Sequence, residues 1–216
     1  MDNINDIYKF INFLADKYRN GYLSPEEVSL ALSQSQNQVF LNYLGKRQNG
    51  NELALVALKP FYKKATISAI SGFVTYPDLW AETQGVYVIS SSGTTSVRVI
   101  LHNELAEALK SVIYPIATNP RYLEQSGGFQ LYPSTISSVS VHYLARPIPA
   151  VMGYSVSGTD IVYDPLTSVQ LEFDKQYWNE IIELACLSIG INLSDPEVAS
   201  YAQGFQLNAN NGNDGN

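Results

Sequence analysis

The spacing of apolar residues changes twice along this chain, and this change restricts the fold more than any other feature. Near both ends apolar residues recur at three- and four-residue steps, as in Ile4, Ile7, Ile11 and Leu14. This is the period of a helix with one buried face. In the middle, as at 139–145 ("VSVHYLA"), apolar and polar residues alternate, which is the period of a half-buried strand. The pattern predicts an α+β fold with a helical hairpin at the N-terminus, a strand-rich antiparallel middle and helices at the C-terminus.

The N-terminal region, 1–45, predicts two helices joined by a turn. The first is expected over Ile4–Tyr18. The second, over Pro25–Leu44, has a complete start signal, because Ser24 can act as N-cap, Pro25 suits the first helical position and Glu27 can close a capping box. Gly45 is the expected stop of this helix.

The rest of the chain is expected to form a strand-rich region, 53–172, and C-terminal helices, 174–203. Asp174 is the expected N-cap of the first of these helices and Gly190 its stop. Residues 1–207 are expected to form a single domain. The tail at 208–216 has no large apolar side chain and is expected to be disordered. In the middle region, strands are predicted at 53–60, 65–71, 138–145, 160–163 and 168–172, with a further strand ending in "YP" near 128–133. A hairpin is predicted within 85–101, with its turn at Ser91–Thr94. A short helix is predicted at 103–113, with Leu105 and Leu109 facing inward.

The charge composition argues against stable nucleic-acid binding. Charged residues make up 15% of the chain and the net charge is −7. Its densest basic spots, Lys46-Arg47 and Lys63-Lys64, are too short for the clustered cations that sequence-neutral DNA binding requires. We expect contact with a passing duplex at most.

The cysteine count and the apolar runs restrict compartment and partners. The single cysteine, Cys186, excludes an internal disulfide and a cysteine-based zinc site. The first residues lack the features of a signal peptide, and no apolar run approaches the roughly 20 residues that span a bilayer. We expect a protein made in a reducing cytoplasm, with no membrane partner.

The residue types that carry catalysis are present but not in catalytic patterns. His102 and His142 lack metal-ligand spacing or a sequence-local carboxylate. "SSSGTTS" matches neither a P-loop nor a dinucleotide fingerprint, and "GYSVSG" is not a nucleophile elbow. Asp160, Asp164 and Glu172 do not follow a calcium-loop spacing. We expect no catalytic residues, no cofactor and no metal.

The strand at 138–145 is followed by a proline-stiffened segment, Arg146-Pro147-Ile148-Pro149. Neither proline can donate to a strand ladder, so the sheet cannot continue here. We expect this arm, flanked by Tyr143 and Tyr154, to contact a neighbouring subunit. The alternative is that the prolines end an edge strand and guard it against aggregation.

The second helix presents an uncharged polar face that we expect to pack against another subunit. Its residues Ser29, Ser33, Gln36 and Asn37 are predicted to be exposed, with Gln34 and Gln38 beside them. Short neutral polar groups allow close approach without the cost of desolvating charges. The alternative is an ordinary Ser/Gln-rich surface of a monomer.

Three segments carry a resemblance to a known group of proteins. They are the opening "FINFLADKYRNGYLSPEEVSLALSQSQNQVFLNYLG", the later "FQLYPSTISSVSVHYLARPIPA" and the closing "LEFDKQYWNEIIELACLSIGINLSDPEVASYAQ". Together these resemble virion structural proteins of Bacteroidetes-infecting tailed phages, including crAss-like phages. More remotely they are similar to the head–tail adaptor (ring) proteins beneath the portal of short-tailed phages. The chain departs from the group at Ala145-Arg146, where two basic residues are common, and at Tyr76-Pro77-Asp78.

The resemblance implies a non-enzymatic connector subunit in the neck or tail region of the virion. It implies a homo-oligomeric ring, twelvefold in the related adaptors, that docks with the portal protein and with other ring or tail proteins. Such a ring would extend the DNA channel, help to retain the genome and seat the tail. The alternatives are a tail-tube, stopper or cargo protein and, from another class, an enzyme with an unrecognised site.

Overall fold

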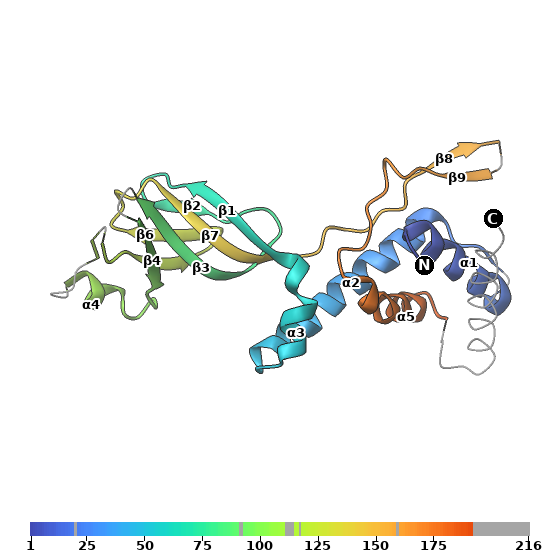
Figure 1. Ribbon diagram of the computed structural model, residues 1–216, viewed down its shortest axis with the longest axis horizontal. Helices are drawn as coiled ribbons and strands as arrows, with labels where there is room; N and C mark the ends of the chain where they lie inside the picture. The colour runs from blue at the N-terminus through green and yellow to red at the C-terminus, as the bar shows by residue number, and fades with distance from the viewer. Residues whose placement is uncertain (20, 91–92, 111–114, 117, 159, 192–216) are drawn as a thin grey trace. The chain divides into compact units, whose positions relative to one another are not determined.

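The computed structural model describes residues 1–191 except 20, 91–92, 111–114, 117 and 159 (Figure 1). The chain is α+β, as predicted, with helices at both ends and a strand-rich middle. It divides into two compact units, where we expected one domain over 1–207. The sheet unit is Phe61–Arg146, and the helical unit combines Met1–Pro60 with the residues from Pro147 onward. The predicted helix near 194–202 and the tail 208–216 lie outside the described residues.

The helical unit begins with α1 (Ile4–Arg19) and α2 (Pro25–Gln48). The predicted apolar face of α1 is buried, and Ser24 and Glu27 form the predicted capping box at the start of α2. The predicted stop at Gly45 is wrong, because α2 continues to Gln48. The residue that leaves the helical conformation is Gly50, whose φ of 79° places it in the left-handed region that favours glycine.

A third helix, α3 (Glu52–Ala57), occupies most of the predicted first strand. The strand prediction over 53–60 was wrong because a short apolar run does not distinguish a buried strand from a buried helical turn. The local signal is Asn51, whose side-chain oxygen accepts from Leu53 N at 2.9 Å and caps the helix. A 3₁₀ turn, η1 (Lys59–Phe61), follows.

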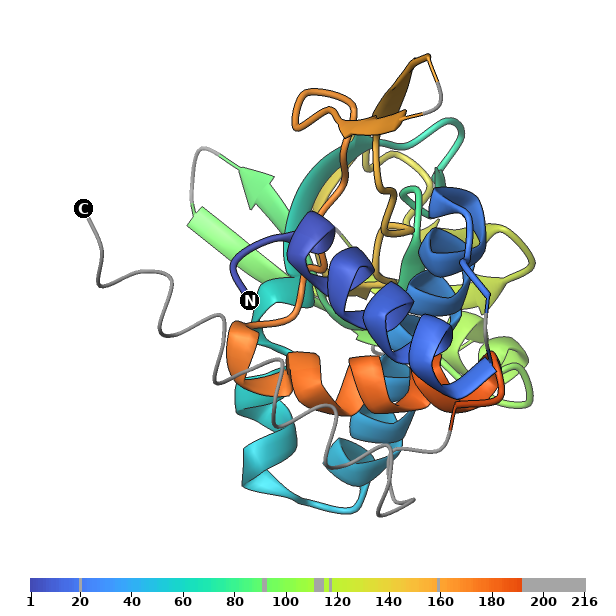
Figure 2. The ribbon, with the colours of Figure 1, turned by 90° about the vertical axis from the view of Figure 1, so that its right-hand side faces the viewer.

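The C-terminal part of the helical unit contains η2 (Lys175–Tyr177) and α5 (Trp178–Ser188). The predicted apolar face of α5 is buried, with Trp178, Ile181 and Ala185 as members. Gly190 ends the helix at φ 83°, as predicted, whereas the Asp174 side chain makes no capping bond. Helices α1 and α5 both pack against α2 (Figures 1 and 2).

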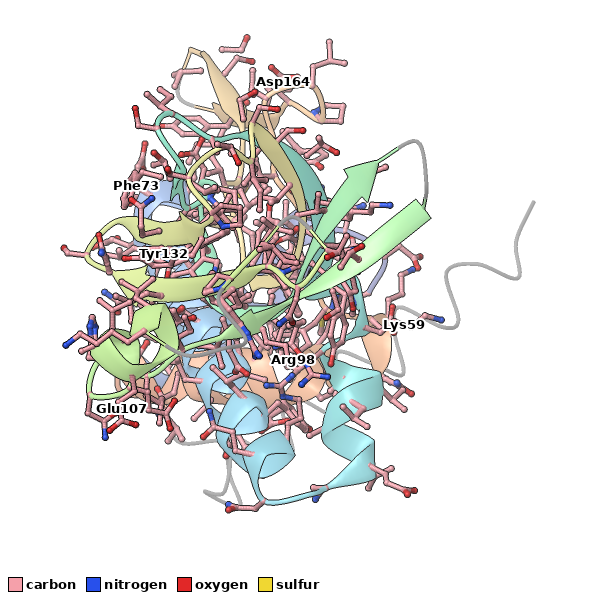
Figure 3. All side chains as sticks on the ribbon, turned by 90° about the vertical axis from the view of Figure 1, so that its left-hand side faces the viewer. Lys59, Phe73, Arg98, Glu107, Tyr132 and Asp164 are labelled. Carbon is pink, nitrogen blue, oxygen red and sulfur yellow. The ribbon has the colours of Figure 1, made fainter. Side chains whose placement is uncertain are left out.

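The sheet unit holds a seven-stranded sheet in the order β1-β7-β3-β4-β5-β6-β2. Its strand pairs are antiparallel except β4 with β5. Figure 3 labels Phe73 on β2, Arg98 on β4 and Tyr132 on β6. The strands are β1 (Tyr62–Ser68), β2 (Phe73–Thr75), β3 (Trp80–Ser90), β4 (Gly93–Val99), β5 (Arg121–Gln125), β6 (Gly128–Tyr132) and β7 (Ser138–Ala145).

Strand β7 has the predicted bounds and lies between β1 and β3. Val139, Val141 and Tyr143 enter the core of the sheet unit, as their alternation predicts. Ser140 faces the other way and is also buried, at 1% exposure. The short helix predicted at 103–113 is α4 (Leu105–Lys110), in which Leu105 and Leu109 are half-buried, so the predicted inward packing is only partial.

A separate hairpin of β8 (Tyr154–Ser157) and β9 (Asp160–Tyr163) belongs to the helical unit (Figure 1). It forms a two-stranded sheet of its own. The strand predicted over 168–172 reduces to a single bridge between Val169 and Val151.

Candidate subunit interface

The polar face predicted on α2 is divided into two parts by the structure. Ser29, Ser33 and Gln36 face the chain's own segment 147–153 and form what we call the α2 seam. The other part is exposed and contains no charged residue. We call it the α2 outer face, and it consists of Leu30, Gln34, Asn37, Gln38 and Leu41.

Two serines of the α2 seam bind the backbone of the proline-containing segment. Met152 N donates to Ser29 Oγ at 2.9 Å, and Ser33 Oγ donates to the carbonyl of Ala150 at 3.0 Å. Both serines are half-buried, so the prediction that they are exposed is wrong. The reason is a contact between residues more than a hundred positions apart, which helical periodicity does not reveal.

Gln36 completes the α2 seam from a fully buried position. Its Nε2 donates to the carbonyl of Ile148 at 3.0 Å, and its Oε1 accepts from Glu172 N at 2.7 Å. The Glu172 carboxylate in turn accepts from Ile148 N at 2.6 Å. Gln36 therefore joins two distant segments to α2, and its side chain is not available to a neighbouring subunit.

The predicted arm is held by the same chain along much of its backbone. Tyr143 lies in the sheet core at 9% exposure, Pro147 is buried, and Arg146 N donates to Leu79 O at 2.6 Å. Arg146, Ile148 and Pro149 are exposed, with Ile148 at 43%, so these three remain candidates for a subunit contact. Nor do the prolines guard an edge, since β7 is an interior strand of the sheet.

Tyr154, predicted to flank the contact, fastens the base of the hairpin to α2. Its hydroxyl donates to the carboxylate of Glu26 in the first turn of that helix. This hydrogen bond is the largest cause of a lowered pKa for Glu26 and of a raised pKa for Tyr154. The two shifts agree that the neutral phenol and the ionised carboxylate are the stable pair.

The α2 outer face combines exposed leucines with neutral polar residues. Leu30 is 60% exposed and Leu41 is 52% exposed, and they lie on one stripe with Gln34 and Asn37. No charged residue occurs between Glu27 and Lys46 on this helix. A helix that only faces solvent normally carries Lys and Glu at such positions.

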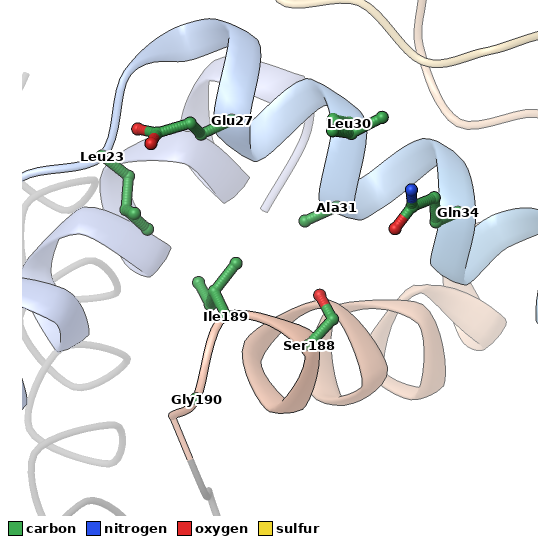
Figure 4. Close-up of a pocket in the computed structure, with 8 residues that line it drawn as sticks. All are labelled: Leu23, Glu27, Leu30, Ala31, Gln34, Ser188, Ile189 and Gly190. Carbon is green, nitrogen blue, oxygen red and sulfur yellow. The ribbon is translucent and has the colours of Figure 1, made fainter.

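Two hollows adjoin the α2 outer face where it meets α5. The larger, of about 550 Å³, is lined by residues of the start of α2 and the end of α5 (Figure 4). The smaller, of about 280 Å³, includes Gln38, Asn42, Leu184 and Leu187. Ridges and hollows of this kind are what a second helix packs into. The larger hollow is lined by Leu23, Glu27, Leu30, Ala31, Gln34, Ser188, Ile189 and Gly190.

The contact between α2 and α5 is fixed by an aromatic cluster. Tyr43 donates to Glu180 Oε2 at 3.0 Å and lies edge-on to Tyr177, with ring centroids 5.5 Å apart. Burial, with the Glu180 hydrogen bond second, raises the pKa of Tyr43 to about 12. The phenol therefore stays protonated and continues to donate at neutral pH. This hydrogen bond holds α2, the helix that carries the outer face, against α5.

The candidate chemical groups are dispersed in the described part of the chain. His102 is exposed, and His142 lies beside Tyr87 with ring centroids 4.9 Å apart. Burial raises the pKa of the Cys186 thiol to about 12, which leaves it protonated and unreactive at neutral pH. Among the described residues, no group of three His, Cys, Asp or Glu side chains is placed to hold a metal ion.

Comparisons with known proteins leave this surface as the main guide to function. No protein-family model matches the sequence, and no curated protein matches it significantly. Within residues that the structure describes, no helix is both long enough and apolar enough to cross a membrane.

Sequence reasoning missed the leucines of the α2 outer face. The signal was present, because positions 30, 34, 37 and 41 follow helical steps of four, three and four residues. It was overlooked because the buried stripe of Val28, Leu32 and Val39 already accounted for the apolar residues of the helix.

Proposed function

We propose that this chain is a non-enzymatic structural subunit of a bacteriophage virion, a ring or adaptor protein of the head–tail connector. The observation that carries the proposal is the α2 outer face, where Leu30 and Leu41 are exposed on a helix without a charge between Glu27 and Lys46. Exposed apolar groups set among neutral polar residues are typical of surfaces that become buried on association. The resemblance of the sequence to virion proteins supplies the biological setting.

The proposed partner of the α2 outer face is another copy of the chain. Side-by-side packing of α2 from adjacent subunits would bury Leu30 and Leu41, and Gln34, Asn37 and Gln38 can exchange hydrogen bonds without a charge-desolvation cost. A ring forms when the α2 outer face of one copy meets a different patch of the next copy, because such head-to-tail contacts can repeat around an axis. By resemblance the ring is twelvefold and docks on the portal protein and on other ring or tail proteins.

The net charge of −7 suits a ring through which DNA passes. A polyanion slides past an acidic wall, whereas a basic wall would retain it. In this role the subunit extends the portal channel and seats the tail without stable DNA binding.

The experiment measures mass by native mass spectrometry, for the full-length protein alone and with the portal protein of the same phage. We expect a ring in at least one of these conditions. A protein that stays monomeric in both would contradict the connector function.

A paired variant tests the surface that carries the proposal. L30E/L41E should remain folded, because both side chains are exposed, but should lose ring assembly by at least tenfold in concentration, since each contact would bury charges without partners. The matched control is L53E/V56E on α3, where the original side chains are 74% and 51% exposed. Assembly of L30E/L41E at the level of the unmodified protein would exclude the α2 outer face as the contact. Ser33 is unsuitable for this test because its hydroxyl bonds Ala150 O within the subunit.

A further inference from the structure

The charges of this chain are distributed unequally between its two units. The sheet unit, Phe61–Arg146, carries six Lys and Arg against five Asp and Glu. The remaining sequence carries seven against fifteen. The sheet unit is thus slightly basic and the other unit strongly acidic, so contact between unlike units of two copies is favoured over contact between like units.

The β8–β9 hairpin is an exposed element of the acidic unit. In its register Val156 lies opposite Ile161 and Ser157 opposite Asp160. Because successive side chains point to opposite faces, Val156 and Ile161 share one face and Asp160 lies on the other. Val156 is 66% exposed and Ile161 is 45% exposed. An isolated two-stranded hairpin is marginally stable in water, so this one gains from pairing with a further strand.

Strand β1 of the sheet unit has features complementary to the hairpin. It is the end strand of its sheet and pairs with β7 on one side. Ala65 and Ile67 point to the core side and are only partly buried, whereas Lys64 points to the opposite face and is exposed. On β1, Lys63 shares the face of Ala65 and Ile67, and Lys64 lies on the other face; on the hairpin, Val162 shares the face of Asp160. Each element thus has an apolar pair on one face and a charge on the other, and Lys64 and Asp160 have opposite charges.

We propose that the β8–β9 hairpin of one copy adds to the free edge of β1 in the next copy. Val156 and Ile161 then extend the apolar side formed by Ala65 and Ile67, and Asp160 lies on the side of Lys64. Backbone hydrogen bonds provide the pairing, as in other cases of strand addition to a sheet edge. The inference rests on the proposed function, because joining two different patches of one chain head to tail generates rings when the rotation closes.

Photocrosslinking locates the contact in the full-length chain. A benzophenone side chain replaces Val156, and unlabelled protein is mixed with ¹⁵N-labelled protein in concentrated solution and with the portal protein. The expected product is a crosslink to peptides containing Ala65 and Ile67, with mixed isotope composition. The control position is Leu166, which is 94% exposed beyond the hairpin and should give less than a tenth of that product. Crosslinks within one chain, crosslinks elsewhere or no crosslinks overturn the proposal.

A charge exchange provides an independent test that separates contact between copies from contact within one copy. D160K and K64E each place like charges together and should weaken assembly severalfold. An equal mixture of the two should assemble like the unmodified protein, because every contact in an alternating arrangement is again between unlike charges. If the contact lies within one chain, the D160K/K64E double variant should assemble normally but the mixture should not. If Lys64 only protects the edge of β1 from non-specific pairing, neither the double variant nor the mixture should recover assembly. Rings that form without these effects overturn the hairpin contact and leave the connector function standing.

Discussion

Ser140 shows at the residue scale how position within a sheet overrides local pattern. Its place between Val139 and Val141 predicts the polar side of a half-buried strand. In the structure β7 lies between β1 and β3, and Ser140 is 1% exposed. Its hydroxyl has no hydrogen-bond partner among the described residues. A buried hydroxyl without a partner loses its hydration and gains nothing in exchange.

We therefore expect S140A to stabilise the protein. Removal of the unsatisfied hydroxyl should raise the free energy of unfolding by about 1 kcal/mol, measured by urea denaturation followed by circular dichroism. The control is S138A, two residues earlier on the same face, where the serine is half-buried. A lower free energy of unfolding for S140A than for S138A would contradict this expectation.

At the scale of elements, α2 has three faces with different surroundings. Its apolar face packs on α1 and α5, the α2 seam holds the 147–153 segment, and the α2 outer face is exposed. The seam depends most on Gln36, since one buried amide satisfies groups of both Ile148 and Glu172. The proline segment is thereby part of the helical unit rather than a free arm.

Substitution of Gln36 should separate these segments from α2. Q36A leaves a carbonyl and an N–H without their partners, so we expect the free energy of unfolding to fall by about 2–4 kcal/mol. Q38A, on the exposed side of the same helix, should change it by less than about 0.5 kcal/mol. Chemical denaturation of the two variants measures the difference. Equal effects would show that the seam bonds do not contribute to stability.

At the scale of the whole molecule, the chain leaves the helical unit after Pro60 and returns to it at Pro147. The sheet unit is therefore one continuous segment with its own core, formed by residues such as Val86, Phe129, Leu131 and Val141. Its last residue, Arg146, bonds Leu79 O within the same unit. This arrangement makes the sheet unit an insertion into the helical unit.

A fragment of residues 61–146 should fold by itself. We expect dispersed NMR amide signals and a cooperative urea transition, because the core of the sheet unit is complete within the fragment. The full-length protein measured under the same conditions is the control, and its sheet-unit signals should overlay those of the fragment. Random-coil signals from the fragment would show that the sheet unit depends on the helical unit.

The sequence alone determined the elements whose signals are local. The capping box of Ser24 and Glu27, the buried face of α1 and the bounds of β7 were correctly predicted, because each depends on residues within a few turns or one strand. The α+β class followed from the same periodicities. Local ambiguity also explains the failure at α3, where a six-residue helix was read as a strand.

Only the tertiary structure decided what these elements contact. Ser29, Ser33 and Gln36 were assigned to a subunit interface because their polarity suits one, yet they bind residues 148–172 of their own chain. The exposed leucines of the α2 outer face became apparent once the other faces of the helix were occupied. Periodicity reports which side of an element is apolar. It carries no information about which distant segment covers that side, because this depends on packing between residues far apart in the sequence.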